Sequence, residues 1–469
     1  MPDRSPEGWA HRPRSTAWPW FRHSQILEGS PRDNCRYHGS TCGSRLGAGS
    51  PGRGLALYFK WWGALELLIG IRDGQAVMGR RVAVTGMGAV TCCGVGPEAL
   101  WDGLVHPTQG DDCRIHDFDP SPWFSPKEVR RLDRFAQFSV AAAQQAVDDA
   151  GPLEVEPDRA GVIFASGAGG FETLAEQVLV NHERGPDRVS PFLVPAMMAN
   201  AGAANISMRL GWTGPCETIV TACAAGTHAI AAAARLIASG RCEVVLTGGA
   251  EASMHEVAIA AFRNMKALSA SGRSRPFDAR RDGFVMGEGA GALVLEEWDR
   301  ARNRGARILA EVMGAASTSD AYHITAPAPD GRGAIACMRL ALEDAGLQPQ
   351  QITHINAHGT STPLNDLAEA RAIQAVFGAP GPTVTSTKGR TGHSFAAAGA
   401  IEAVATILAM EHEQIPPTAG CDQQDPDIAL DVVKREPRSW VPGPVLSNSF
   451  GFGGHNGCLV LGPPPRSDQ

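Results

Sequence analysis

The stretch Glu217-Thr-Ile-Val-Thr-Ala-Cys223 is a run of β-branched residues that ends in a cysteine, and an alanine-rich stretch follows it. Thr383-Val-Thr-Ser-Thr-Lys388 repeats this pattern later in the chain, again before a stretch of small residues. Gly291-Ala-Leu-Val-Leu295 starts 68 residues after the cysteine, and Gly457-Cys-Leu-Val-Leu461 starts 69 residues after the lysine. Matched patterns at matched spacings predict an internal duplication, with two β/α halves that meet near Gly305.

Strand and helix patterns alternate along the chain from Arg80 onward. Runs of β-branched and apolar residues predict strands at 82–85, 161–165, 218–222, 244–247, 292–295, 308–312, 354–357, 383–386 and 459–461. Alanine-rich stretches predict helices, including 139–150, 227–239, 333–345 and 396–410. We expect Gly86-Met-Gly88 to form a turn after the first strand. The alternation indicates an α/β fold built in layers.

The composition excludes several classes of protein. The chain has 469 residues, 43% of them hydrophobic and 19% charged, and its net charge of −7 argues against general nucleic-acid binding. Its eleven cysteines include no C-x-x-C pair, so we expect a reducing compartment, the cytoplasm, and no metal site. No apolar run reaches the ~18 residues of a membrane span. The nearest, 56–71, is interrupted by Lys60 and Glu66.

Residues 1–77 differ from the rest of the chain. They hold five of the ten tryptophans and carry a net charge of +4, and no hydrophobic periodicity runs through them. Met78 directly precedes the first strand pattern. We favour the interpretation that the start codon lies at Met78, and the alternative is a targeting or regulatory arm. The predicted units are therefore the extension 1–77, an N-terminal half 78–305 and a C-terminal half 306–469.

Cys223 has the setting of a nucleophile. It lies where a predicted strand turns into a helix, and free N–H groups at a helix N-terminus favour a thiolate. The same N–H groups can stabilise an oxyanion, and the small neighbouring residues leave room for a substrate. The alternative for an isolated cysteine is a buried and inert side chain.

Two histidines end strands of the duplicated fold. His358 lies in Asn356-Ala-His-Gly-Thr-Ser-Thr-Pro363, and His393 lies in Lys388-Gly-Arg-Thr-Gly-His. Sites in α/β folds gather at the carboxyl ends of strands, so both imidazoles are candidate catalytic groups. Lys388 and Glu369 are ionisable groups near them, and a structural ion pair is the alternative role for these two.

A glycine-rich loop, Ser449-Phe-Gly-Phe-Gly-Gly-His-Asn-Gly457, precedes the last strand. Phosphate binding is one interpretation of such a loop. However, the loop lacks the lysine of a phosphate-binding motif, and a strand rather than a helix follows it. We therefore expect backbone donors for an oxyanion, with a phenylalanine beside an apolar channel.

Several of these motifs, in this order, resemble those of a β-ketoacyl-acyl carrier protein synthase II. The resemblance runs from about Gly79 to Gly462, and its motifs are Thr221-Ala-Cys-Ala-Ala-Gly226, Ser274-Arg-Pro-Phe-Asp278, Arg281-Asp-Gly-Phe-Val285, Ser319-Asp-Ala-Tyr-His323, 356–363 and 448–456. The resemblance implies the thiolase-like fold, a five-layer αβαβα sandwich of two duplicated halves, in a homodimer. It implies no cofactor.

The resemblance also implies a Cys-His-His mechanism. Cys223 would accept an acyl chain as a thioester from acyl carrier protein. Malonyl-acyl carrier protein would then lose CO2, and His358 and His393 would stabilise its enolate, which attacks the acyl group in fatty acid chain elongation. The supporting roles that the resemblance implies are a histidine-orienting pair (Lys388, Glu369), an oxyanion hole and acyl gate (Cys223, Phe452, Phe450) and pantetheine contacts (Thr360, Thr362).

A basic cluster is the expected docking site for the carrier. Lys127, Arg130 and Arg131 form it, and the resemblance adds Lys266. Acyl carrier proteins are strongly acidic, so local positive charge would guide the encounter despite the net negative charge of this chain. A solvated helix face is the alternative for such a cluster.

The chain also departs from the family pattern. The segment from Asp112 to Arg130 is short, and Ser394-Phe-Ala-Ala stands where the family often has Leu-Gly, so the acyl length remains open. A thiolase would need a second active-site cysteine in the last glycine-rich loop, and a non-enzymatic chain-length factor would lack Cys223. The main alternative is the catalytic ketosynthase of a type II polyketide or specialised lipid pathway.

Overall fold

A computed structural model describes residues 79–107 and 113–464. The strands are β1 (Val82–Thr91), β2 (Gly94–Val95), β3 (Ala160–Ala165), β4 (Cys216–Glu217), β5 (Val244–Glu251), β6 (Gly289–Glu297), β7 (Ala310–Ser319), β8 (His354–Asn356), β9 (Thr383–Thr385), β10 (Gln414–Ile415), β11 (Asp431–Val432), β12 (Arg438–Ser439), β13 (Val445–Gly451) and β14 (His455–Gly462). The extension 1–77 lies outside the described residues, so its interpretation stays a prediction.

The helices connect and cover these strands. They are α2 (Pro97–Val105), α3 (Pro126–Val129), α4 (Arg134–Ala150), α5 (Phe171–Arg184), α6 (Leu193–Met197), α7 (Ala201–Leu210), α8 (Ala225–Ala238), α9 (Glu256–Asn264), α10 (Trp298–Asn303), α11 (Arg332–Asp344), α12 (Pro363–Phe377), α13 (Lys388–Thr391) and α14 (Ala398–Glu411). The described 3₁₀ turns are Pro157–Arg159, Pro186–Arg188, Ala222–Ala224, Pro349–Gln351 and Phe395–Ala397.

The strand order repeats in the two halves of the chain. The first half runs β1-β6-β5-β3-β4 and the second runs β7-β14-β13-β8-β9. In each half the first two pairings are antiparallel and the next two are parallel. Antiparallel pairing of β1 with β7 joins the halves. The predicted duplication is therefore confirmed, whereas the boundary at Gly305, between α10 and β7, stays a prediction.

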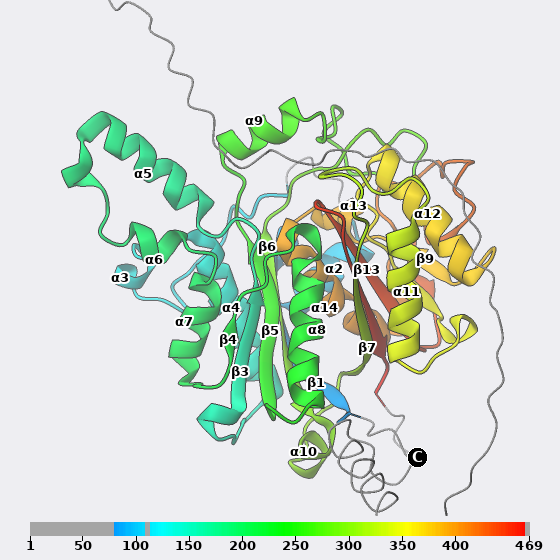
Figure 1. The fold of residues 1–469 in the computed structure, drawn as a ribbon, viewed down its shortest axis with the longest axis horizontal. Helices are drawn as coiled ribbons and strands as arrows, with labels where there is room; N and C mark the ends of the chain where they lie inside the picture. Colours follow the sequence, from blue (N-terminus) through cyan, green and yellow to red (C-terminus); the bar gives the residue numbers. More distant parts are fainter. Residues whose placement is uncertain (1–78, 108–112, 465–469) are drawn as a thin grey trace, which may run out of the picture. The chain divides into compact units, whose positions relative to one another are not determined.

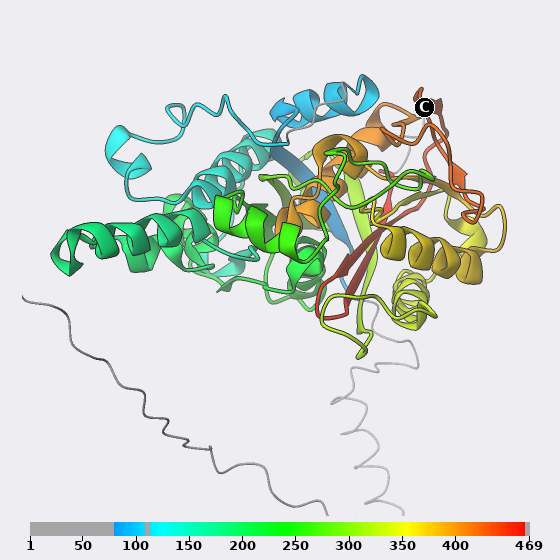
Figure 2. The ribbon, with the colours of Figure 1, turned by 90° about the horizontal axis from the view of Figure 1, so that it is seen from above.

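Five layers follow from the alternation of side chains along the strands, since neighbouring residues point to opposite faces. Val162 and Leu246 face a core formed with α4 and α7, whereas their neighbours Ile163 and Val245 face α8 and α14. In the second half Leu459 faces α8 and α14, and the strands' other face packs on α11 and α12. This is the predicted five-layer αβαβα sandwich. Figures 1 and 2 show the cyan helices of the first half and the yellow helices of the second on opposite sides.

Two predicted elements differ in the structure. Gly86 and Gly88 are not a turn but lie inside β1, because α4 crosses there and a Cβ atom at either position would come within 2.1 Å of a carbonyl oxygen of α4. The strand predicted at 218–222 is also wrong. The strand there is β4, which covers only Cys216 and Glu217, and beyond it the chain leaves β3, its partner strand.

The central helices α8 and α14 approach each other through small residues. A Cβ atom on Gly226 of α8 would come within 2.8 Å of the Ala396 carbonyl oxygen and of the Ala400 amide nitrogen. A Cβ atom on Gly399 of α14 would come within 2.7 Å of the Thr227 amide nitrogen. The absence of both side chains sets how closely the two halves meet in the middle layer.

We predict that Gly226→Ala destabilises the protein although alanine is the better helix former. Overpacking of a close contact costs about 1–3 kcal/mol, which exceeds the gain of about 1 kcal/mol in helix propensity. Chemical denaturation of the variant measures the loss. Arg235→Ala, an exposed position on the same helix, serves as control and should change the free energy of unfolding little. A Gly226→Ala variant as stable as the wild type would show that the helices can separate.

Candidate active site

Cys223 lies in the strained turn that opens α8. The turn covers Ala222–Ala224, and Ala222 has φ +50, a left-handed conformation that non-glycine residues rarely adopt. The side chain of Cys223 is only 7% exposed and borders a cavity of about 760 Å³. The thiol thus meets a substrate-sized space from a fixed position.

Both predicted histidines reach the same cavity. His393 Nε2 lies 3.1 Å from Cys223 Sγ. The rings of His358 and His393 meet edge to face, with centroids 5.4 Å apart. His358 also contacts the ring of Phe450 at 5.9 Å. Three groups separated by 132 to 170 residues in any pairing other than the two histidines are therefore brought together by the ends of α8, β8 and the turn before α14.

Burial keeps all three groups neutral. It raises the pKa of the Cys223 thiol to about 11, although hydrogen bonds from the backbone of Phe452 and of Cys223 and the charge of Lys388 act in the opposite direction. We expected the helix N-terminus to favour the thiolate, but desolvation outweighs it. Burial, together with the charge of Lys388, holds the pKa of both imidazoles well below the usual value. Neutral imidazoles can donate a hydrogen bond from one ring nitrogen.

The predicted pair of Lys388 and Glu369 is divided between two interactions. Lys388 forms a buried salt bridge with Glu402 of α14 rather than with Glu369. Glu369 accepts hydrogen bonds from the backbone N–H groups of His358 and Gly359, each at 2.8 Å. Glu369 therefore fixes the loop that carries His358, and Lys388 lies close enough to both histidines to affect their charge.

Glu402 is a functional neighbour that the sequence analysis missed. It is 1% exposed, and burial raises the pKa of its carboxyl to about 7 while the charge of Lys388 acts in the opposite direction. A signal was available, because Glu402 is a lone acid within the apolar stretch 398–410. An acid in such a stretch needs a cationic partner when it is buried.

The remaining expected contacts separate into two groups. Thr360, Thr362, Phe450 and Phe452 border the cavity, and the Thr360 and Thr362 hydroxyls are 2.9 Å apart. Lys266 is exposed and also borders it.

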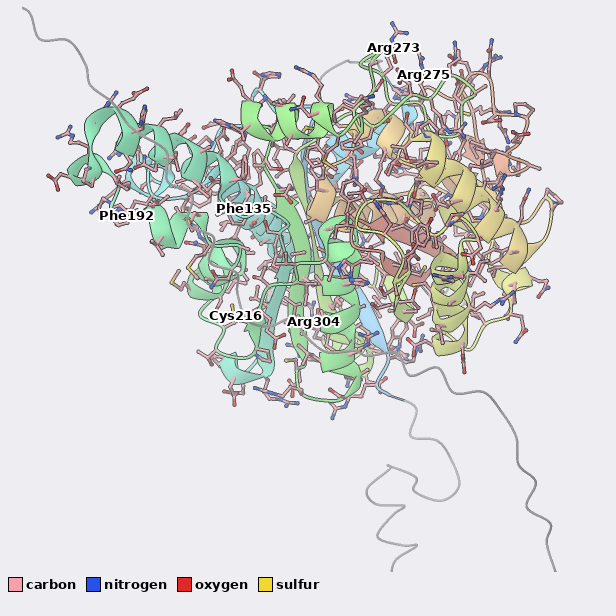
Figure 3. The ribbon with its side chains drawn as sticks, turned by 45° about the horizontal axis from the view of Figure 1, so that its top comes forward. Phe135, Phe192, Cys216, Arg273, Arg275 and Arg304 are labelled. Carbon is pink, nitrogen blue, oxygen red and sulfur yellow. The ribbon has the colours of Figure 1, made fainter. Side chains whose placement is uncertain are left out.

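The three basic residues of α3 and its C-terminal end do not border the cavity. Lys127, Arg130 and Arg131 are exposed, and the Arg131 guanidinium lies 4.5 Å from the centre of the Phe192 ring. In Figures 1 and 2, α3 and α9 lie well apart. Arg273 and Arg275, in the loop after α9, add to the basic residues on the side of Lys266 (Figure 3).

An aromatic cluster beside His393 was also missed. Phe395 stacks on His393 with ring centroids 5.1 Å apart, and it contacts Phe262 at 5.1 Å and Phe284 at 5.8 Å. Its φ of +48 is left-handed. The unusual Ser394-Phe-Ala-Ala sequence therefore puts a large ring between the catalytic histidine and the wall of the cavity.

Two kinds of feature were searched for in the described residues. Within 79–107 and 113–464, no three or more His, Cys, Asp or Glu side chains are grouped so that they could hold a metal ion. The helices of the same part of the chain include none that is both long and apolar enough to cross a membrane.

Comparisons with known proteins agree with this geometry. The chain matches the family described as "Beta-ketoacyl synthase, N-terminal domain" over residues 110–301 and "Beta-ketoacyl synthase, C-terminal domain" over 309–422. It is 44% identical over 406 residues to "3-oxoacyl-[acyl-carrier-protein] synthase 2" of Synechocystis sp., which covers 81% of this chain and 98% of the relative. A protein of the same name from Staphylococcus aureus is 41% identical over 409 residues, with the same coverage.

Solved structures give the same result. "The ishigamide ketosynthase/chain length factor" matches with a TM-score of 0.78 and 36% identity, over 82% of this chain and 99% of that one. A type II PKS acyl-carrier protein in complex with its ketosynthase, AntDE:AntF, matches with a TM-score of 0.75 and 31% identity over the same shares of both chains.

Proposed function

The chain belongs to the β-ketoacyl synthase family, and we propose that Cys223, His358 and His393 are the residues that perform its chemistry. The enzyme condenses an acyl thioester with malonyl-acyl carrier protein and releases CO2 and 3-oxoacyl-acyl carrier protein, a step of fatty acid chain elongation. The observation that carries the assignment of residues is the contact of 3.1 Å between His393 Nε2 and Cys223 Sγ, inside a cavity that His358 also borders.

The first half-reaction is acyl transfer to Cys223. The sulfur attacks the thioester carbonyl of the acyl chain, and the C–S bond to the carrier breaks. The carrier's thiolate takes the proton that the Cys223 thiol gives up, and His393 is within reach to pass it on. The backbone N–H groups of Cys223 and Phe452 point toward the sulfur, which supports their assignment as donors to the oxyanion.

The second half-reaction is condensation. The bond between the malonyl carboxylate and its α-carbon breaks, CO2 leaves, and its electron pair forms an enolate. We assign the stabilisation of the enolate oxygen to His358 and His393, since buried neutral imidazoles are preorganised hydrogen-bond donors. The α-carbon then attacks the acyl carbonyl, the C–S bond breaks and Cys223 regains a proton. The product is two carbons longer than the acyl group.

The polyketide alternative fits less well. The relatives at 41–44% identity are named 3-oxoacyl-acyl carrier protein synthase 2, whereas the polyketide ketosynthase complex is 31% identical. Cys223 itself distinguishes the chain from a chain-length factor, and the last glycine-rich loop contains no cysteine of a thiolase.

We predict that His358→Ala and His393→Ala each slow malonyl decarboxylation by roughly 10²–10³, the value of one donor aimed at a developing oxyanion. Acylation of Cys223, followed by intact-protein mass spectrometry, should fall much less, and His358→Ala should retain more of it because His393 alone contacts the sulfur. Cys223→Ala, the control, should form no acyl-enzyme. Equal loss of acylation and decarboxylation in His358→Ala would contradict this division of roles.

The carrier protein is the partner that the comparisons support most directly, and we assign its docking to the exposed basic residues. Lys127, Arg130 and Arg131 can meet an acidic surface without rearrangement, because no short ion pair to any of them is recorded among the described residues. Glu128 between them is already engaged by Ser125 and Arg209. Lys266 would meet the carrier at the mouth of the cavity.

We predict that Lys127→Glu, Arg130→Glu and Arg131→Glu together raise the KM for carrier-bound substrates by about tenfold, since each exposed charge pair contributes roughly 0.2–1 kcal/mol. Turnover of small pantetheine thioesters should not change. Arg339→Glu on α11 is the matched reversal elsewhere on the surface. Equal losses with carrier-bound and small substrates would instead indicate damage to the fold.

We also propose that the enzyme is a homodimer that pairs along the open edge of the sheet. β4 ends the strand order and bonds to β3 on one side only. Cys216 on this edge is exposed (Figure 3), as are Met208 of α7 and Val220, which are 72% and 53% exposed. An unpaired strand edge flanked by apolar side chains is a natural site for pairing with a second copy.

We expect sedimentation equilibrium to give twice the mass of the chain, and Met208→Asp with Val220→Asp to shift the protein toward the monomer. A charge buried against an apolar partner surface would oppose association. Leu340→Asp, at an exposed position on α11, is the control. A double variant that remains a dimer would place the interface on another surface.

The cysteines support a reducing location. The nine in the described part of the chain are free, although burial brings some of them together, as with Cys337 and Cys458. We therefore propose the cytoplasm as the compartment in which the enzyme works.

A further inference from the structure

One buried carboxylate of the cavity has no part in the mechanism above. Glu251 is the last residue of β5, is 1% exposed and borders the same cavity as Cys223. Much of the wall around it is apolar, with the rings of Phe171, Phe262 and Phe395. An acid in such a wall costs free energy unless its hydrogen-bonding capacity is satisfied.

The carboxylate of Glu251 connects two separate loops. Its Oε2 accepts a hydrogen bond from the N–H of Gly167 at 2.9 Å, and its Oε1 accepts one from the N–H of Ala168 at 3.3 Å. The backbone of Ala396 provides a further hydrogen bond to the same carboxyl. Gly167 and Ala168 follow β3, whereas Ala396 belongs to the turn that leads from His393 into α14.

Each of these loops provides part of the cavity wall. Gly167 and Ala168 border the cavity directly, and Phe395, next to Ala396, borders it on the side of His393. The left-handed φ of Phe395 is a conformation that costs of order 1–3 kcal/mol and persists only where the surroundings enforce it. The hydrogen bond between Glu251 and Ala396 is one such constraint.

The cluster is matched to an ionised carboxylate. All three groups that hydrogen-bond to Glu251 are N–H donors, so a proton on the carboxyl would find no acceptor among them. Burial raises the pKa of this carboxyl to about 7, whereas the three backbone hydrogen bonds act in the opposite direction. The nearby charge of Asp133 adds to the effect of burial.

We propose that Glu251 is a positioning residue that holds the 167–168 loop and the Phe395 turn in place, and that it thereby determines which acyl chains Cys223 accepts. The inference rests on the proposed function, because it concerns the acyl half-reaction of the same site. Glu251 touches neither reacting carbon. It acts through the width of the cavity, and displacements of about 1 Å in such walls are enough to change rates strongly.

The first test replaces Glu251 by glutamine, which has the same shape but offers one N–H₂ group to N–H donors. Acylation of Cys223 is measured with acetyl, hexanoyl, dodecanoyl and hexadecanoyl carrier substrates. We expect the KM for the long chains to rise on the order of tenfold, whereas the acetyl reaction and malonyl decarboxylation change by less than about threefold. Glu256→Gln on α9, an exposed acid five residues further on, should keep the wild-type chain-length profile.

The second test uses Gly167. A Cβ atom there would lie 2.6 Å from Glu251 Oε2 and 3.6 Å or more from the other atoms around it, so Gly167→Ala displaces the carboxylate in particular. Gly167→Ala should therefore change the chain-length profile as Glu251→Gln does. In a Glu251→Ala background the same substitution should add nothing, since the clash is gone. Melting temperatures of all variants separate this effect from loss of the fold.

The outcomes are distinguishable. A uniform change for all chain lengths in Glu251→Gln, or an equal effect of Gly167→Ala in both backgrounds, would overturn the positioning role while leaving the proposed function intact. If the wild-type protein forms no acyl-enzyme at Cys223 with any of the four chains, the proposed function fails and the inference fails with it.

Discussion

The close contact between α8 and α14 is the constraint on which the rest of the structure depends. Gly226 and Gly399 have no side chains to separate the two helices, and each backbone approaches the other to a distance at which a Cβ atom would clash. Cys223 stands at the start of one helix and His393 just before the other. The 3.1 Å contact between thiol and imidazole is thus a result of how two glycines allow the halves to meet.

Burial in this middle layer also sets the chemistry. The same desolvation that raises the pKa of Cys223 lowers the pKa of His358 and His393, so that the resting site holds a thiol and two neutral rings. The charges around it are satisfied within the protein. Lys388 pairs with Glu402, and Glu369 is bound by backbone N–H groups. A site of this kind has little charge to reorganise when an enolate forms, which is the condition for strong stabilisation.

The sequence predicted what depends on local pattern and repetition. The duplicated strand order, Cys223 and both histidines could be recognised because each follows a strand in a repeated unit. The pattern could not reveal long-range contacts. Gly86 and Gly88 looked like a turn because the crossing of α4 that requires them is formed 50 to 60 residues later. Lys388 was paired with the wrong acid, and Glu251 was overlooked, because both depend on which helix or loop lies opposite in space.

The pairing of β1 with β7 has a consequence for synthesis on the ribosome. β1 begins at Val82, but its second partner strand starts at Ala310, and the sheet of the second half is closed only by β14, which ends at Gly462. A nascent chain therefore exposes unpaired strand edges until almost its last residue has emerged. Long-range pairing of this kind folds slowly and leaves partly folded chains open to aggregation, so the C-terminal strand acts as the closing step of folding for the whole enzyme.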